Sequence, residues 1–185
     1  MPSGGGATFV RPMAEPPLPP ASAPPQPVWP GRLFDELQVG EVFCSQARTV
    51  TESDVAAFAG LSGDFNPLHT DEEYARSTPF RGRIAHGLLV QSIASGLANQ
   101  TAIFDGTIVA VLEMLIRYRA PVYPLDTIHI ELRVAERDPE PTARRGWVRF
   151  ATSVLNQRGE TVTDGEWLTL MHRRRPVRRA APRGD

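Results

Sequence analysis

One predicted helix constrains the fold of this chain more than any other feature. Residues 84–100 carry apolar side chains nearly all the way round a helical projection, so a helix here needs neighbours on most of its sides. Small residues, among them Gly87, Ala94 and Gly96, let other groups approach its backbone closely. The chain must therefore build its core around this helix.

The hydrophobic pattern changes to a period of two after Gly106. The β-rich segments are residues 107–119, 126–137, 146–156 and 161–172, and residues 157–160 form a short hairpin turn between the last two. Antiparallel strands joined by short turns, together with one buried helix, predict an α+β domain in which a single sheet wraps around that helix. The uncovered face and edges of such a sheet favour a homodimer or an oligomer built from dimers.

The region before the helix predicts two shorter helices separated by a loop. Thr51 followed by Asp54 is close to a capping box and starts the first of them. Pro67 disfavours helical geometry at the residue before it, so residues 64–69 are expected to form a loop. A second N-cap signal then predicts a short helix over residues 71–76.

Both ends of the chain differ in composition from residues 31–171. Ten of the 18 prolines fall in residues 1–30, which predicts a disordered, Pro-rich arm, with a proline-motif ligand as the alternative. Residues 172–185 contain six arginines and one aspartate, which predicts a flexible, Arg-rich tail. Such a tail is either simply solvated or binds phosphate groups of a nucleic acid, a membrane surface or a cofactor.

Several protein classes are excluded by composition. No stretch reaches the roughly 18 consecutive apolar residues of a membrane helix, and the N-terminus lacks the pattern of a secretory signal. The single cysteine, Cys44, excludes an internal disulfide framework, so we expect a reducing, cytoplasmic setting. A net charge of −1 provides no general reason to expect a nucleic-acid partner.

The predicted loop holds the strongest chemical signal. Asp64 and His69 are five residues apart and separated by Pro67, so they cannot be neighbours on one helix face. A loop shaped by Asn66 and Pro67 can instead turn both side chains inward, where a carboxylate and an imidazole can orient one water and move protons. The alternative is a structural one, in which Asp64 and Asn66 form Asx turns and His69 precedes a helix cap.

His86 and Gly87 mark the start of the buried helix. The first N–H groups of a helix lack intrahelical acceptors and its dipole favours negative charge, so a glycine there can stabilise an oxyanion or enolate. Ser95 follows two turns later, either to contact a substrate or to bond to its own helix backbone. His86 either lines a pocket or packs at the helix start. The four histidines show no metal-ligand spacing, so no metal is expected.

Two ordered blocks of sequence resemble the MaoC-like hydratases and dehydratases of the hotdog fold, which include the (R)-specific enoyl-CoA hydratases. The second block is residues 80–89, and the resemblance extends over about residues 33–171. The first block matches the family signature without a gap at Phe58, Leu61, Ser62, Gly63, Asp64, Asn66, Pro67, Leu68, His69 and Ala75.

This resemblance implies a lyase with a single hotdog domain. It implies no cofactor, because the CoA or carrier group belongs to the thioester substrate. Asp64 and His69 would be the pair that activates water, one as the base and the other as the proton donor to the α-carbon. The Gly87 amide would polarise the thioester carbonyl, Asn66 would hold the loop, and Ser95 would lie near the site. The expected reaction is the reversible hydration of a trans-2-enoyl-CoA or acyl-carrier thioester to a (3R)-3-hydroxyacyl thioester.

Other functions stay open at this point. The same chemistry can serve a branched, dicarboxylic or aromatic-pathway acyl-CoA, because the sequence does not place the side chains of the acyl pocket. A thioesterase is disfavoured by the loop motif, and a non-catalytic binding subunit is disfavoured by the intact Asp64 and His69 pair. A nucleic-acid binder is disfavoured because the Arg-rich tail lacks interleaved aromatic residues.

Overall fold

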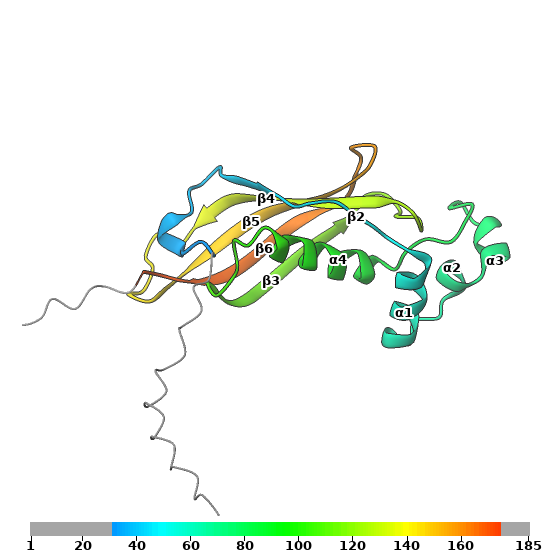
Figure 1. Ribbon diagram of the computed structural model, residues 1–185, viewed down its shortest axis with the longest axis horizontal. Coiled ribbons are helices and arrows are strands. Elements are labelled where there is room, and N and C mark those ends of the chain that lie inside the picture. Colours follow the sequence, from blue (N-terminus) through cyan, green and yellow to red (C-terminus); the bar gives the residue numbers. More distant parts are fainter. Residues whose placement is uncertain (1–30, 175–185) are drawn as a thin grey trace, which may run out of the picture.

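A curved antiparallel sheet is the largest element of the computed structural model, which describes residues 31–174 (Figure 1). Its strand order is β1-β4-β5-β6-β3, and β2 also pairs with β4. The strands are β1 (Val42–Cys44), β2 (Arg48–Thr49), β3 (Ile108–Tyr118), β4 (Thr127–Arg137), β5 (Arg145–Asn156) and β6 (Thr161–His172). The last four lie within one residue of the segments expected from the period-two pattern.

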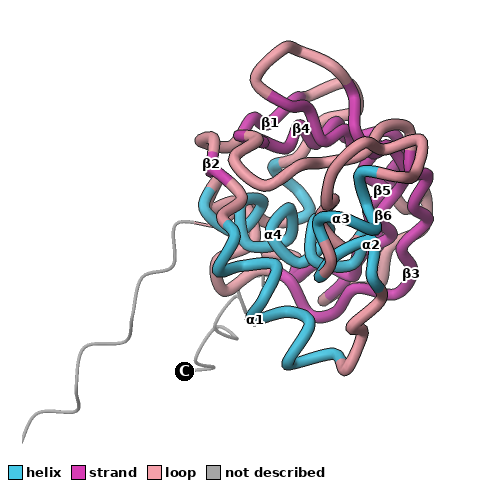
Figure 2. The backbone as a smooth tube through the Cα atoms, turned by 90° about the vertical axis from the view of Figure 1, so that its right-hand side faces the viewer, coloured by secondary structure: helices cyan, strands magenta, loops and turns pink. Residues whose placement is uncertain are grey.

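One face of the sheet forms the core together with helix α4 (Gly87–Gln100). Alternate residues of the central strands are fully buried, such as Ile128, Ile130 and Leu132 in β4 and Phe150 in β5. Because side chains alternate between the faces of a strand, these residues all point to the same side. Figure 2 shows the strands curving around α4, as the period-two pattern and the single apolar helix predict.

Helix α4 is buried on most of its sides, as predicted, but one stripe of its surface is exposed. Leu88 is 63% exposed, and Ser92 and Gly96, one and two turns further along, are exposed as well. The buried positions are Leu89, Val90, Ile93, Ala94, Leu97 and Ala98. The helix therefore has an apolar side against the sheet and a second side that no described residue covers.

Four short helical elements precede α4. The 3₁₀ turn η1 (Phe34–Glu36) opens the described chain, while α1 (Glu52–Ser62), α2 (Pro67–Thr70) and α3 (Glu72–Arg76) gather at one end of the sheet (Figure 1). Asn66, which precedes Pro67, is not helical, as predicted, and Pro67 occupies the first position of α2. The expected loop over residues 64–69 is therefore a loop only over residues 64–66, while residues 67–69 are helical, because proline is well suited to a first helical position.

The predicted capping box at α1 is confirmed. The Thr51 side chain accepts from the Asp54 N–H at 3.1 Å, and Asp54 accepts in return from the Thr51 N–H at 2.8 Å. This backbone hydrogen bond is the largest of the effects that lower the pKa of the Asp54 carboxyl, and the Arg48 guanidinium lowers it further. The charged form of Asp54 therefore stabilises the fold.

Asp54→Asn is expected to reduce the amount of folding stability that the protein loses as the pH falls. A carboxyl with a lowered pKa in the folded state contributes stability above its unfolded pKa of about 3.9, and this contribution is lost as the pH falls through the folded value. Thermal unfolding measured at each pH should therefore show that the parent protein loses more stability between pH 5 and pH 3 than the variant does. Parallel curves for the two proteins over this range would contradict the assignment.

The Arg-rich end of the chain begins inside the fold. His172 is the last residue of β6, Arg173 pairs with Asp35 at 2.7 Å, and Arg174 pairs with Glu36 at 2.8 Å. The predicted Pro-rich arm, residues 1–30, and the rest of the predicted tail, residues 175–185, lie outside the described residues. Within residues 31–174, no helix has the length and apolar character required to cross a membrane.

Candidate functional site

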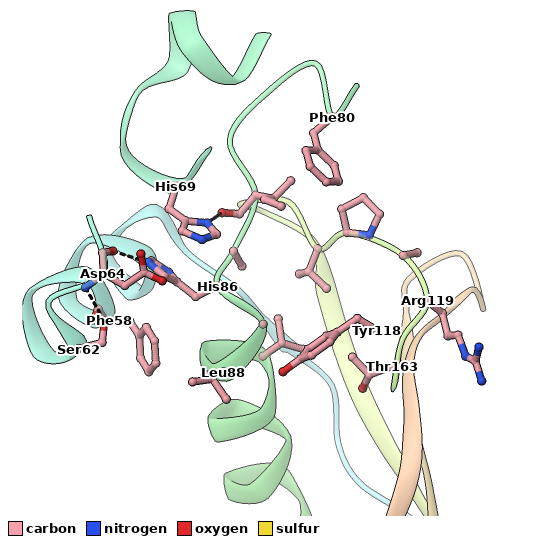
Figure 3. Close-up of a pocket in the computed structure, with 17 residues that line it drawn as sticks. Phe58, Ser62, Asp64, His69, Phe80, His86, Leu88, Tyr118, Arg119 and Thr163 are labelled. Atoms are coloured by element: carbon pink, nitrogen blue, oxygen red, sulfur yellow. Dashed lines mark hydrogen bonds between the residues drawn. The ribbon is translucent and has the colours of Figure 1, made fainter. Parts of the chain in front are cut away.

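A cavity of about 670 Å³ opens between the helical end of the molecule and the sheet (Figure 3). It lies against the first turn of α4, between the loop that follows α1 and the segment that follows β3. Most of its wall is apolar. Ser62, Asp64, His69 and His86 are polar groups on the side of the loop and the helix entry, and Tyr118, Arg119 and Thr163 are polar groups on the sheet side. The lining residues are Phe58, Ser62, Asp64, His69, Phe80, Ile84, Ala85, His86, Gly87, Leu88, Val90, Tyr118, Arg119, Ala120, Pro121, Val122 and Thr163.

Local hydrogen bonds shape the loop that carries Asp64. Gly63 ends α1 in the left-handed region, with φ of 76°, a conformation that glycine adopts without strain. One Asp64 carboxylate oxygen accepts from the Asn66 N–H at 3.2 Å, and Asn66 Oδ1 accepts from the Leu68 N–H at 3.0 Å. The two Asx turns of the structural alternative are thus present, and in the same loop Asp64 also lines the cavity.

The His69 ring is oriented by a backbone carbonyl. Its Nδ1 lies 2.8 Å from the carbonyl oxygen of Ile84. Because a carbonyl only accepts, Nδ1 carries the hydrogen, and a neutral His69 has its free lone pair on Nε2. The ring lines the cavity (Figure 3). His69 therefore brings a nitrogen that can accept a proton to the cavity that Asp64 lines.

His86 stands closer to the predicted pair than its distance in the sequence suggests. Its ring stacks on His69 with centroids 3.8 Å apart, and its Nε2 donates to the Asp64 carbonyl oxygen at 2.9 Å. Ligand atoms of Asp64, His69 and His86 lie within 4.8 Å of one another, as do those of Cys44, His129 and Glu131 on the sheet. Both groups contain donor types that bind transition metals, although the spacing of histidines along the sequence indicated neither.

Gly87 lies at the first position of α4, where its N–H has no intrahelical acceptor. A Cβ atom on Gly87 would lie 2.6 Å from the ring of Tyr118, so a glycine is required for this ring to pack against the helix start. Tyr118 is the last residue of β3 and is 54% exposed. Tyr118 narrows the cavity beside the Gly87 amide. The sequence did not indicate this position of Tyr118, because it depends on the register of β3.

Ser95 does not line this cavity. It lies eight residues beyond Gly87, about 12 Å further along the helix at 1.5 Å per residue. There it borders a separate cavity of about 40 Å³, together with Phe104, Met114 and Trp167. The predicted proximity of Ser95 to the site residues is therefore absent within one chain, while Asp64, Asn66, His69, His86 and Gly87 do come together.

Charge at the rim of the cavity is largely neutralised. Arg119, which lines the cavity, donates to both carboxylate oxygens of Asp164, at 2.8 and 3.1 Å. This pair lowers the pKa of the Asp164 carboxyl and raises that of Arg119. Arg119 is the only arginine or lysine among the described residues that line the cavity.

A known protein family matches the part of the sequence that forms most of the sheet, α4 and the loop of the candidate site. Residues 36–153, more than half of the chain, match the MaoC like domain. The chain belongs to the MaoC-like dehydratase family. This confirms the resemblance carried by the loop and helix-entry blocks.

Named relatives of this MaoC-like chain act on acyl thioesters. An (R)-specific enoyl-CoA hydratase from Rhodospirillum rubrum is 35% identical over 133 residues, which cover 72% of this chain and 87% of the relative. A mitochondrial 3-hydroxyacyl-[acyl-carrier-protein] dehydratase from Arabidopsis thaliana is 34% identical over 137 residues, which cover 73% and 78%. The homologues thus belong to the hydro-lyase class that the sequence predicted.

Solved structures confirm the predicted hotdog domain. An (R)-hydratase from Pseudomonas aeruginosa, in the unliganded form, superposes with a TM-score of 0.65 at 34% identity and covers 84% of this chain and 97% of its own. A Mycobacterium tuberculosis protein with a double hotdog fold has a TM-score of 0.69 at 22% identity and covers 84% of this chain and 48% of its own. The MaoC-like chain therefore has a single hotdog domain, in which the sheet wraps around α4.

Proposed function

We propose that this chain catalyses the reversible hydration of trans-2-enoyl thioesters to (3R)-3-hydroxyacyl thioesters. The observation that carries the proposal is a single cavity in which Asp64, His69 and the first amide of α4 meet. An apolar wall suits an acyl chain, and the polar groups on one side suit a water and a carbonyl. The names of the relatives support the same reaction class.

The proposed mechanism divides the work between these three groups. Asp64 and His69 hold one water, and one of them takes its proton while the other supplies a proton to the α-carbon. The thioester carbonyl accepts from the Gly87 N–H, where the helix dipole stabilises the enolate-like negative charge that develops. Asn66 caps α2 and keeps the loop in the conformation that presents Asp64 and His69.

The wall of the cavity favours an uncharged acyl chain. Phe58, Phe80, Leu88 and Val122 present apolar surface, and Arg119 at the rim is already paired with Asp164. Burying a carboxylate without a partner is costly, so this geometry disfavours the dicarboxylic alternative. The geometry does not separate a CoA thioester from an acyl-carrier thioester, and both carriers appear among the relatives.

Purified protein is expected to hydrate crotonyl-CoA or a medium-chain trans-2-enoyl-CoA. The loss of absorbance of the conjugated thioester measures the reaction, and chiral analysis of the product should show the (3R) isomer. A trans-2-enoyl-CoA that ends in a carboxylate should react with a lower kcat/KM because its charge enters an apolar wall. An acyl-carrier thioester of the same chain length tests the carrier.

A panel of uncharged enoyl thioesters on both carriers, all without reaction, would reject the proposed activity. A faster reaction of the carboxylate-ended substrate would support the lyase activity but reject the preference for an uncharged acyl chain.

The predicted cytoplasmic location stays a prediction.

We also propose that the chain is a homodimer joined along β3. Among the described strands, β3 pairs only with β6, on one side, and it exposes Val111, Leu112, Met114 and Leu115 to 40–54%. A long apolar edge strand of this kind is a template for pairing with another chain. Tyr118 at the end of β3 borders the cavity, so the substrate would enter near the boundary between the subunits.

Met114→Arg is expected to convert the dimer to a monomer, because it would place a charge in the centre of this edge. Sedimentation velocity measures the change, and Arg133→Glu, which changes a charge on β4 away from β3, provides a matched control. A parent protein that sediments as a monomer at micromolar concentration would contradict the proposed dimer.

A further inference from the structure

His86 connects the two side chains of the proposed catalytic pair. It occupies the N-cap position of α4, yet its side chain makes no capping hydrogen bond and is turned toward the Asp64 loop instead (Figure 3). Only 2% of its surface is exposed. One edge of its ring bonds to the Asp64 backbone, and one face stacks on His69. A residue that only filled space at the helix start would not require an imidazole.

The contacts between the loop and the helix entry are reciprocal. His86 donates from Nε2 to the Asp64 carbonyl at 2.9 Å, and His69 donates from Nδ1 to the Ile84 carbonyl at 2.8 Å. Between them, the Ile84 N–H donates to the Leu68 carbonyl at 3.1 Å. Each imidazole therefore fastens its own segment to a carbonyl of the other segment, and displacement of one ring would disturb both.

The surroundings of His86 place a hydrogen on its Nε2. A carbonyl only accepts, so the Nε2 that bonds to the Asp64 carbonyl carries a hydrogen. Its Nδ1 is buried and has no hydrogen-bond partner among the described residues. The Nε2–H therefore makes the one hydrogen bond of this ring to a described residue, and that bond ends on the Asp64 loop.

We propose that His86 is a positioning residue of the hydration reaction. Through its Nε2–H and the face of its ring, it holds the Asp64 backbone and the His69 ring at the spacing at which both groups act on one water. The inference rests on the proposed function. It extends that function because His86 acts through Asp64 and His69, without contact with the reacting atoms.

Two substitutions separate this role from simple packing. His86→Phe keeps an aromatic ring for His69 but removes the donor to Asp64, while His86→Gln supplies a neutral amide donor that can reach the same carbonyl. We expect His86→Phe to lower kcat by ~10²-fold with KM within about threefold of the parent, since small misplacement of reacting groups has effects of this size. His86→Gln should restore kcat to within about tenfold of the parent.

His129→Gln is the matched control, because it makes the same replacement on β4, outside the cavity. Its kcat should equal that of the parent. A folded His86→Phe that keeps the kcat of the parent would overturn the proposal, and so would a His86→Gln as slow as His86→Phe. A loss that appears only in KM would likewise overturn it, since it would assign His86 to substrate binding.

A measurement on the unsubstituted protein keeps the test decisive if a variant fails to fold. Nitrogen-15 NMR of the histidine rings should show a hydrogen on Nε2 of His86, because this atom donates to the Asp64 carbonyl. A neutral ring with its hydrogen on Nδ1 would overturn the proposal. A parent protein that is inactive on all enoyl thioesters would instead reject the proposed function, whatever the tautomer of His86.

Discussion

Asp64→Asn is expected to lower kcat for enoyl-thioester hydration by ~10²–10⁴-fold, the usual contribution of a positioned general acid or base. Asparagine has nearly the same shape, and its Oδ1 can still accept from the Asn66 N–H, so the loop and the fold should persist. It cannot exchange a proton with water at neutral pH. Initial rates with a saturating enoyl-CoA measure the effect, and circular dichroism and thermal unfolding check the fold.

Glu73→Gln is the matched control for Asp64→Asn, because it removes one carboxylate from the surface of α3, at the same end of the molecule. Its rate should equal that of the parent. If Asp64→Asn retained more than about a tenth of the kcat of the parent, Asp64 would serve the loop only through its Asx turn, and the proposed mechanism would lose one of its two proton-transfer groups.

Gly87→Val is expected to lower kcat/KM by at least ~10²-fold, the scale of losing one oxyanion-hole donor. The Gly87 N–H remains in this variant, but the new side chain collides with the Tyr118 ring, which lies 2.6 Å from the position of the first added carbon. Either the ring moves into the cavity or the added methyl groups occupy the space of the thioester carbonyl. Rates measured over a range of substrate concentrations separate the effects on KM and kcat.

Gly96→Val is the matched control for Gly87→Val, since Gly96 lies on the same helix and a Cβ there meets nothing within 4 Å. It should retain the activity of the parent. The milder Gly87→Ala should be partly relieved by Tyr118→Ala in the same chain, because the second change removes the ring that the new methyl group meets. Full activity of Gly87→Val would show that the carbonyl binds elsewhere.

The elements of this fold could be predicted because each one has a local cause. The capping box of Thr51 and Asp54 starts α1, Pro67 ends helical geometry at Asn66, and alternation marks β4 to β6 within one residue. The start of α4 is less exact: the apolar run begins at Ile84, three residues before the helix does. Residues 84–86 are not helical, and their backbone and side-chain groups bond instead to the loop and to Val122, in the connection between β3 and β4.

The loop of the candidate site could be predicted because its residues lie close together in the sequence, and His86 and Gly87 could be predicted from their place at a helix start. Asp64, Asn66 and His69 belong to one loop, whose proline and Asx turns set its shape locally. The family resemblance implied that Ser95 lies near them, but the rise of α4 separates Ser95 from Gly87 along the helix axis.

The sequence by itself determined which segments become strands and helices, and which loop carries a carboxylate and an imidazole, because capping, proline geometry and hydrophobic period act over a few residues. Only the tertiary structure decided that His86 stacks on His69, that Tyr118 lies over Gly87, and that the rim arginine pairs with Asp164. These contacts join residues 17 to 45 positions apart. They depend on strand register and on the packing of α4 against the sheet, which no local pattern encodes.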